Sequence, residues 1–258
     1  MAVNRRRFFQ LTGATALGVA SSQVLPAASE ERSPGPARPA DKPLVGQRWA
    51  MAIDVGKCRE EEDCRDCIAA CDKAHNVPHF DNKKDEVKWI WKEPFEEALQ
   101  NQSSQFQAER LRHAHVLVFC NHCDNPPCTK VCPTQATWKR DDGVVMMDWH
   151  RCIGCRYCVA GCPYGSRSFN WRDPRPHIDE LNPEFPTRTR GVVEKCNFCE
   201  ERLARGEQPA CVVACKEKAL IFGDLEDPES EIRKVLRERP SVRRKVALGT
   251  QPQIFYLL

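Results

Sequence analysis

The fold is decided by the stretch Cys152-Ile153-Gly154-Cys155-Arg156-Tyr157-Cys158-Val159-Ala160-Gly161-Cys162-Pro163, whose spacing is C-x2-C-x2-C-x3-C-P. Three thiolates from one tight loop can reach three corners of one cubane [4Fe–4S] cluster. The fourth, one helical turn later, points toward a second cluster. Gly154 permits backbone N–H groups to approach the sulfurs, and Pro163 ends the short helix. The stretch therefore predicts two neighbouring iron–sulfur clusters.

The chain of 258 residues contains 16 cysteines, which form four groups of four with none left over. In chain order the groups are Cys58, Cys64, Cys67 and Cys71; Cys120, Cys123, Cys128 and Cys132; Cys152, Cys155, Cys158 and Cys162; and Cys196, Cys199, Cys211 and Cys215. The third group has the spacing of bacterial ferredoxins, and the second is a variant with a longer gap. Because only 8% of the residues are aromatic, we expect inorganic clusters to organise much of the interior.

Two other uses of the cysteines stay open at this point. Cys-x2-Cys pairs are common in zinc sites, but one tetrahedral zinc ion does not need the longer run of the third group. Disulfide scaffolds occur in oxidising compartments, but they are usually shorter chains without repeated C-x2-C triplets. Iron–sulfur clusters remain the favoured interpretation.

The N-terminus predicts a cleavable export signal over residues 1–29. It has a basic region at Asn4-Arg5-Arg6-Arg7, an apolar stretch from Leu11 to Ala20, and small residues at Ala27-Ala28-Ser29. The arginine pair followed by Phe8-Phe9 resembles the twin-arginine signal, whose route carries proteins already folded around their cofactors. A basic, disordered N-terminus or an uncleaved membrane anchor are the alternatives.

The segment after the signal, residues 30–44, is rich in proline and predicts an extended linker. Residues 1–29 carry three arginines and no acid, which leaves 36 basic and 36 acidic residues in the rest of the chain. This balance argues against binding of nucleic acid. No run of 18 apolar residues occurs, so we expect no transmembrane helix.

From Trp49 to Leu258 the chain resembles the four-cluster electron-transfer subunits of complex iron–sulfur molybdoenzymes and their relatives. Besides the cysteines, the resemblance rests on Lys195-Cys196-Asn197-Phe198-Cys199, Pro209-Ala210-Cys211-Val212-Val213-Ala214-Cys215 and Ala219-Leu220-Ile221-Phe222-Gly223-Asp224. It implies an α+β domain over 45–258 made of two nested bacterial-ferredoxin-like modules with short strands, short helices and long loops. The inner module is expected over about 115–170, and the outer one over about 49–80 and 190–258.

Each module is expected to hold two clusters by exchanging the fourth cysteines of its two groups. In the inner module one set is Cys120, Cys123, Cys128 and Cys162, and the other is Cys152, Cys155, Cys158 and Cys132. The resemblance implies that the first and fourth groups pair in the same way. The outer sets are then Cys58, Cys64, Cys67 and Cys215, and Cys196, Cys199, Cys211 and Cys71.

The first group departs from the family pattern, because five residues separate Cys58 from Cys64 where two are usual. Some relatives replace one ligand by tryptophan and hold a three-iron cluster. All sixteen positions here are cysteine, so we expect four [4Fe–4S] clusters. Basic residues near the ligands are expected to offset cluster charge, although any one could be an ordinary solvated charge. They are Lys57, Arg59, Arg65, Lys73, Lys130, Arg151, Arg156, Lys195, Arg202 and Lys216.

Residues 51–58 and 67–78 look most like the DsrO family, the exported ferredoxin-like subunits of the DsrMKJOP transmembrane complex of sulfur metabolism. This likeness implies a periplasmic electron-transfer subunit, peripheral to the inner membrane. Its expected partners are a quinone-interacting membrane subunit like DsrP and other redox subunits such as a multihaem cytochrome c. The alternatives are the equivalent subunit of an exported molybdoenzyme of polysulfide, tetrathionate or DMSO reductase type, or of a hydrogenase, and a zinc-stabilised interaction protein.

No catalytic motif accompanies the cysteines. The seven histidines form no metalloprotease pattern and are expected to be structural or on the surface, and no P-loop or nucleophile elbow occurs. We therefore expect that the chain is not an enzyme by itself and that a partner performs the catalysis.

A few elements can be predicted from local pattern. Residues 137–148 hold two strand-like runs around Asp141-Asp142-Gly143, which predicts a hairpin, and 115–119 predicts a strand. Residues 95–111 favour an amphipathic helix, and 172–186 favour a surface loop. In each group the fourth cysteine follows the third by four residues, as on one helical turn.

Overall fold

The computed structural model describes residues 42–58, 64–100, 109–112 and 114–258. All of them belong to one compact unit that begins at Pro34. The predicted signal over 1–29, nearly all of the linker, and the long gap between Cys58 and Cys64 lie outside the described residues.

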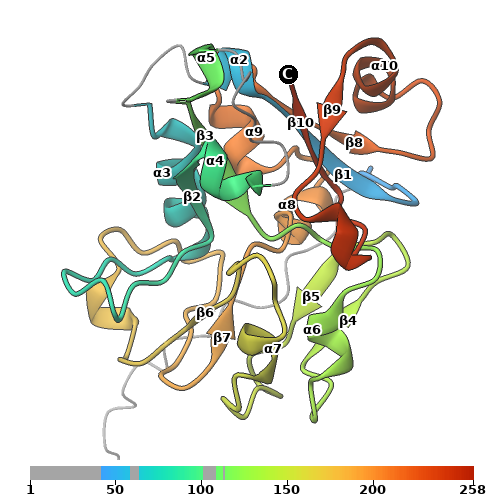
Figure 1. Ribbon diagram of the computed structural model, residues 1–258. Helices are drawn as coiled ribbons and strands as arrows, with labels where there is room; N and C mark the ends of the chain where they lie inside the picture. Colours follow the sequence, from blue (N-terminus) through green and yellow to red (C-terminus); the bar gives the residue numbers. More distant parts are fainter. Residues whose placement is uncertain (1–41, 59–63, 101–108, 113) are drawn as a thin grey trace, which may run out of the picture. The chain divides into compact units, whose positions relative to one another are not determined.

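The largest sheet has four strands in the order β8 (Leu220–Asp224), β1 (Trp49–Asp54), β10 (Ile254–Leu257) and β9 (Ser241–Val242) (Figure 1). Strand β1 runs parallel to β10 and antiparallel to β8, so the two ends of the described chain meet in this sheet.

Alternation along β1 separates two packing faces. Trp49, Met51 and Ile53 point into the main core, whereas Ala50 and Ala52 pack with Ile232 of helix α10 (Glu231–Glu238). The small alanine side chains allow this helix to lie close to the sheet.

The other sheets are pairs of short antiparallel strands. They are β2 (Ile90–Pro94) with β3 (His115–Phe119), β4 (Thr137–Lys139) with β5 (Val145–Met147), and β6 (Ser168–Phe169) with β7 (Val193–Glu194). The predicted strand at 115–119 and the predicted hairpin are therefore confirmed. The hairpin turn uses Gly143 at φ +84°, a conformation that glycine adopts without steric cost.

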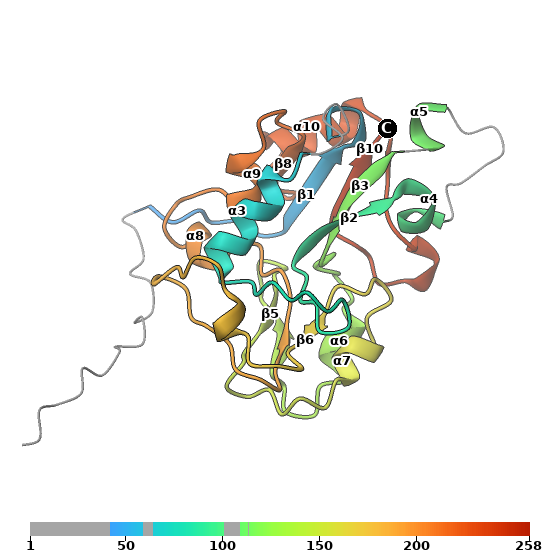
Figure 2. The ribbon, with the colours of Figure 1, turned by 90° about the vertical axis from the view of Figure 1, so that its left-hand side faces the viewer.

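Short helices carry six of the sixteen cysteines. Helix α3 (Asp66–His75) packs against α9 (Ala210–Ala214), and α6 (Pro127–Lys130) packs against α7 (Tyr157–Ala160). Figures 1 and 2 show the first pair beside β1 and the second pair beside the β4–β5 hairpin. Groups one and four thus meet at one helix pair, and groups two and three meet at the other.

The remaining helical elements are single turns. They are α2 (Val55–Cys58), α4 (Phe95–Ala98), α5 (Glu109–Arg112), η2 (Arg175–His177), α8 (Glu200–Leu203) and η3 (Val246–Leu248). The prediction of a continuous helix over 95–111 is wrong, because Leu99 leaves helical geometry directly after α4. The segment 101–108 lies outside the described residues.

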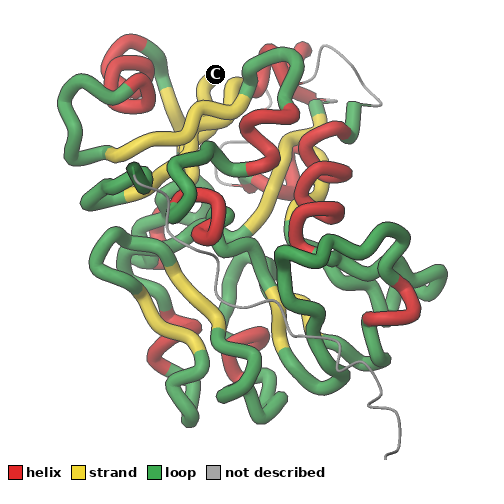
Figure 3. Tube along the Cα trace, turned by 180° about the vertical axis from the view of Figure 1, so that it is seen from behind, coloured by secondary structure: helices red, strands yellow, loops and turns green. Residues whose placement is uncertain are grey.

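The described chain has the expected α+β character, with short elements joined by long loops (Figure 3). The segment 172–186 is one of these loops and is largely exposed, as predicted. Among the described residues, no helix has the length and apolar character needed to cross a membrane.

Candidate metal centre

The first set of cysteines lines one small cavity. Cys58 ends α2, Cys67 lies in the first turn of α3, Cys215 caps the C-terminal end of α9, and Cys64 precedes α3. The same cavity is lined by Lys92, Leu117, Glu217 and Leu220. Two helices and the start of a third thus bring four thiols together around one cavity.

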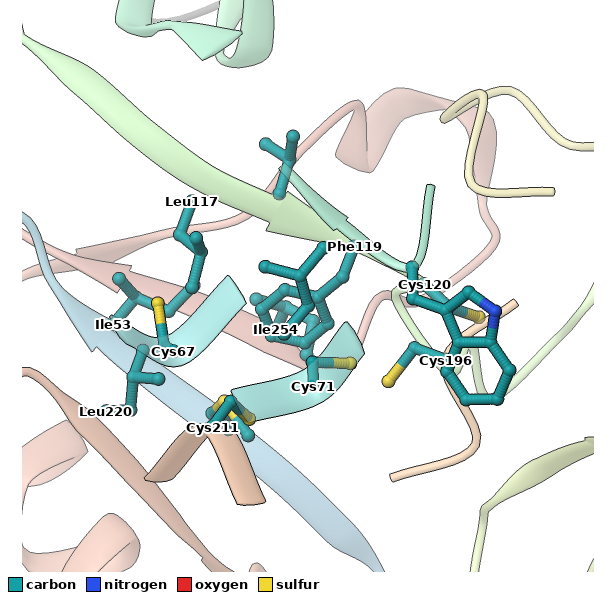
Figure 4. Close-up of a cluster of buried hydrophobic side chains, with 14 of the residues drawn as sticks. Ile53, Cys67, Cys71, Leu117, Phe119, Cys120, Cys196, Cys211, Leu220 and Ile254 are labelled. Carbon is teal, nitrogen blue, oxygen red and sulfur yellow. The ribbon is translucent and has the colours of Figure 1, made fainter. Parts of the chain in front are cut away.

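The second set lies one helical turn further along α3. The charges of Cys196, Cys199 and Cys211 all act on Cys71. In Figure 4 the sulfur of Cys67 lies near Ile53 and Leu117, whereas the sulfur of Cys71 points toward Cys196. The third and fourth cysteines of group one therefore face different cysteines, as the proposed exchange of ligands requires.

The third and fourth sets are built on the α6–α7 pair. The charges of Cys120, Cys128 and Cys162 act on Cys123. The charge of Cys152 raises the pKa of Cys158. Cys132 and Cys152 also pack in the same apolar cluster as Cys158. Cys155 is half-buried in the loop that leads into α7.

The helical geometry of the fourth cysteines differs from the sequence-based expectation in three groups. Cys67 and Cys71 both lie within α3, as expected. Cys132, Cys162 and Cys215 instead lie just after α6, α7 and α9 end. A proline follows the first two of these cysteines, which is consistent with a helix that cannot continue.

The four sets follow one another in a line. The charge of Cys67, in the first set, raises the pKa of Cys211 in the second. The charge of Cys120, in the third set, likewise raises the pKa of Cys196 in the second. Cys128 of the third set acts on Cys158 of the fourth. The sets at the two ends each contain one buried and three half-buried cysteines, whereas seven of the eight cysteines in the middle sets are buried.

The chemistry of the thiols fits metal clusters. All sixteen cysteines are free of disulfides. Burial, and then repulsion by neighbouring thiolates, raise the pKa of Cys67, Cys123 and Cys196 to about 12. Such thiols hold their protons at neutral pH until a metal displaces them. Convergent sulfur donors of this kind suit iron–sulfur clusters, and the disulfide alternative finds no support.

Glycine is required at position 154 because of a close backbone contact that the sequence does not reveal. Gly154 has φ +71°, and a Cβ there would collide with the carbonyl oxygen of Gly191. The loop of the third cysteine group therefore lies directly against the chain that leads into β7. The contact is with a neighbouring backbone carbonyl.

A buried ion pair holds the C-terminal end of α3. Arg188 and Glu194 form it with both side chains fully buried and 2.6 Å between Nη2 and Oε2. Arg188 also donates to the carbonyl oxygens of His75 and Asn76, and Trp89 donates to Glu194. Asn76 adopts the left-handed conformation that ends the helix. Sequence reasoning missed this network because the ion pair lies more than 100 residues from the helix end and the tryptophan that it contacts.

His75 is a core residue beside the second set. Its Nδ1 lies 2.9 Å from the carbonyl oxygen of Cys71, and its Nε2 lies 2.9 Å from Oε1 of Glu201. Burial opposes the charge of Glu201, but the hydrogen bond and charge of His75 outweigh it and keep the pKa of this carboxyl below its usual range. The histidine thus fixes the end of α3, in line with the structural role expected for it.

Two cations lie deep among the sulfurs. Lys195 was among the basic residues singled out from the sequence, and it is buried beside Cys196. Arg167 was missed, although its Nη2 donates to the sulfur of Cys128 at 3.0 Å. It lies five residues after Cys162, and no local pattern separates it from a surface arginine.

Comparison with known proteins gives a consistent result. Residues 113–175 match the model of a 4Fe-4S dicluster domain, a stretch that contains the second and third cysteine groups. The chain is 41% identical to the Hdr-like menaquinol oxidoreductase iron–sulfur subunit 1 of Archaeoglobus fulgidus, over 98% of this chain and 97% of that protein. It is 34% identical to a tetrathionate reductase subunit from Salmonella typhimurium, over 98% and 88%. It is also 34% identical to the iron–sulfur cluster-binding subunit of menaquinone reductase from Nitratidesulfovibrio vulgaris, over 81% and 88%.

Proposed function

Because this chain belongs to the family of iron–sulfur electron-transfer subunits of oxidoreductase complexes, we propose that it carries electrons along four [4Fe–4S] clusters between a quinone-interacting membrane subunit and other redox subunits. Within that family we propose a DsrO-like subunit of a membrane-bound complex of sulfur metabolism, with a DsrP-like membrane partner and a multihaem cytochrome c among the other subunits. The chain is not catalytic alone.

The observation that carries the proposal is the linear order of the cysteine sets, with buried sets in the middle and half-buried sets at both ends. The sulfurs in each set would hold one cluster, which supplies a one-electron carrier when bound. Burial of the middle sets keeps water and unrelated partners away from the interior of the path. The half-buried ends would leave one cluster within reach of a partner at each side.

The surface beside the fourth set suits a docked protein. Ile153 and Tyr157, which flank Cys155, are 66% and 61% exposed, and Val131 is also exposed next to Cys132. Exposed apolar residues gathered at one place often mark a protein interface. We propose that the membrane subunit covers this surface, since a closely packed interface brings the terminal cluster near its partner.

Metal content tests the proposal directly. We expect anaerobically purified protein to contain about sixteen iron and sixteen acid-labile sulfide per chain, because each cubane holds four of each. The protein should be brown and should bleach on reduction. A colourless protein with substantial zinc and little iron would mean that the chain is a zinc-stabilised interaction protein instead.

Export is the second testable part of the proposal. We propose that the chain is carried folded to the periplasm by the twin-arginine route, and that it stays peripheral to the inner membrane through its partners. Changing Arg5 and Arg6 to lysine should leave unprocessed precursor in the cytoplasm, because the receptor reads this arginine pair. Cell fractionation and immunoblotting measure the effect, with Arg7→Lys as the matched control. Normal periplasmic accumulation of the double variant would exclude this route.

The alternative is the equivalent subunit of an exported molybdoenzyme of polysulfide, tetrathionate or DMSO reductase type, or of a hydrogenase. The likeness to a tetrathionate reductase subunit is the observation that supports this alternative. Purification from native membranes separates the two. Co-purifying molybdenum or nickel supports the alternative, and a quinone-interacting membrane subunit with a multihaem cytochrome supports the leading proposal.

A further inference from the structure

Two buried cations occupy the junctions between consecutive cysteine sets. Arg167 is 4% exposed and Lys195 is 1% exposed. Neither pairs with a carboxylate in the part of the chain that the structure describes. By contrast, the other two buried cations, Arg188 and Arg244, have carboxylate partners in Glu194 and Glu93. A buried cation without an anion is costly, so these two require another source of negative charge.

Arg167 lies between the third and fourth sets. Its guanidinium donates to Sγ of Cys128 at 3.0 Å and to Oγ1 of Thr137 at 2.8 Å, and its Nη1 lies 3.7 Å from Sδ of Met147. It also hydrogen-bonds Cys158, a member of the fourth set.

Lys195 lies between the second and third sets. Its ammonium donates to the carbonyl oxygen of Val145, and to that of Cys196 at 2.7 Å. Burial is the largest influence on this ammonium and lowers its pKa, while the neighbouring Cys120 and Cys128 of the third set and Cys196 of the second act in the opposite direction. The two cations therefore both lie near the third set, Arg167 in contact with Cys128 and Lys195 at the backbone of Cys196.

On the basis of the proposed four-cluster function, we propose that Arg167 and Lys195 raise the reduction potentials of the clusters on either side of them. A cluster with four thiolates carries about −2 when oxidised and gains one further negative charge on reduction. A fixed cation in a low-dielectric interior stabilises that added electron, and it also screens the repulsion between neighbouring reduced clusters. The third set, which contacts Arg167 and lies within electrostatic range of Lys195, is the most strongly affected.

The test is a set of cluster potentials, measured by redox titration with electron paramagnetic resonance on anaerobically loaded full-length protein. In Arg167→Gln, the equilibrium constant for reduction should fall at least tenfold, about 59 mV, at the third and fourth clusters only. In Lys195→Gln, the same fall should occur at the second and third clusters only. Arg167→Lys, which keeps the charge, should restore most of the potential.

Lys130→Gln is the matched control, because Lys130 lies between Cys128 and Cys132 in sequence but is solvent-exposed. Water and salt screen an exposed charge, so its removal should change the equilibrium constants less than threefold. Unshifted potentials in the Arg167 and Lys195 variants with full iron content would overturn the inference, as would an equal shift at all four clusters. Low iron in the wild type would instead count against the proposed function.

A measurement on the unmodified protein decides the matter if Arg167→Gln does not assemble. Among the arginines that the structure describes, Arg167 alone donates to a cysteine sulfur. Wild-type protein labelled with 15N-arginine should therefore show a nitrogen hyperfine coupling on the third and fourth clusters, whose proposed ligands Cys128 and Cys158 accept from Arg167, in pulsed electron paramagnetic resonance. Absence of this coupling in fully loaded protein would overturn the assignment of Arg167.

Discussion

Changing Cys162 to serine is expected to alter the same cluster signal as Cys128→Ser, and to leave in place the signal that Cys158→Ser alters. Cys162 follows Cys158 by one helical turn, yet it lies with Cys120 and Cys123 of the other group. Loss of one thiolate should remove or convert a single cluster and slow transfer through the whole series. Electron paramagnetic resonance of the reduced variants, together with iron analysis, measures the result.

The matched comparison is Cys132→Ser, the reciprocal exchange. Cys132 belongs to group two by sequence but packs in the apolar cluster that contains Cys158. It should therefore affect the signal that Cys158→Ser affects. If Cys162→Ser and Cys158→Ser altered one signal while Cys128→Ser altered another, each group would hold its own cluster and the exchanged-ligand arrangement would be wrong.

Glu194→Gln is expected to destabilise the protein strongly, although Glu194 is not a proposed ligand. Its carboxylate lies fully buried against Arg188, and removing one partner leaves an uncompensated charge that costs about 3–5 kcal/mol. In a chain of this size that corresponds to a fall of roughly 6–20 °C in the unfolding temperature. The temperature at which the visible cluster absorbance bleaches measures the fall, because α3 carries Cys67 and Cys71 and is held by Arg188.

The double variant Arg188→Met with Glu194→Gln should bleach at a higher temperature than Glu194→Gln alone, since no unpaired charge then remains. Glu180→Gln, in the loop 172–186, is the control. It breaks the exposed pair between Lys73 and Glu180, which contributes little, and should leave the bleaching temperature unchanged. A Glu194→Gln protein as stable as the wild type would show that α3 does not depend on this ion pair.

Local pattern was sufficient where neighbouring residues decide the outcome. The strand at 115–119 and the hairpin around Gly143 follow from alternation and turn chemistry over a few residues, and both are present. The helix over 95–111 was predicted wrongly, because amphipathic spacing alone does not reveal that Leu99 leaves helical geometry after one turn. Short helices depend on what packs against them, which the spacing does not contain.

The sequence by itself determined the chemistry: sixteen thiols at ferredoxin spacing define the kind of cofactor, because ligand type and spacing fix what can bind. The tertiary structure alone decided what surrounds those thiols. It brought Arg167 to Cys128, Lys195 to the junction of two sets, and Arg188 to the end of α3. These contacts join segments that lie 39 residues apart for the first and 112 for the last, and no local signal marks a buried cation before the chain folds around it. Spacing therefore sets which atoms bind the clusters, and packing sets the electrostatic environment in which they work.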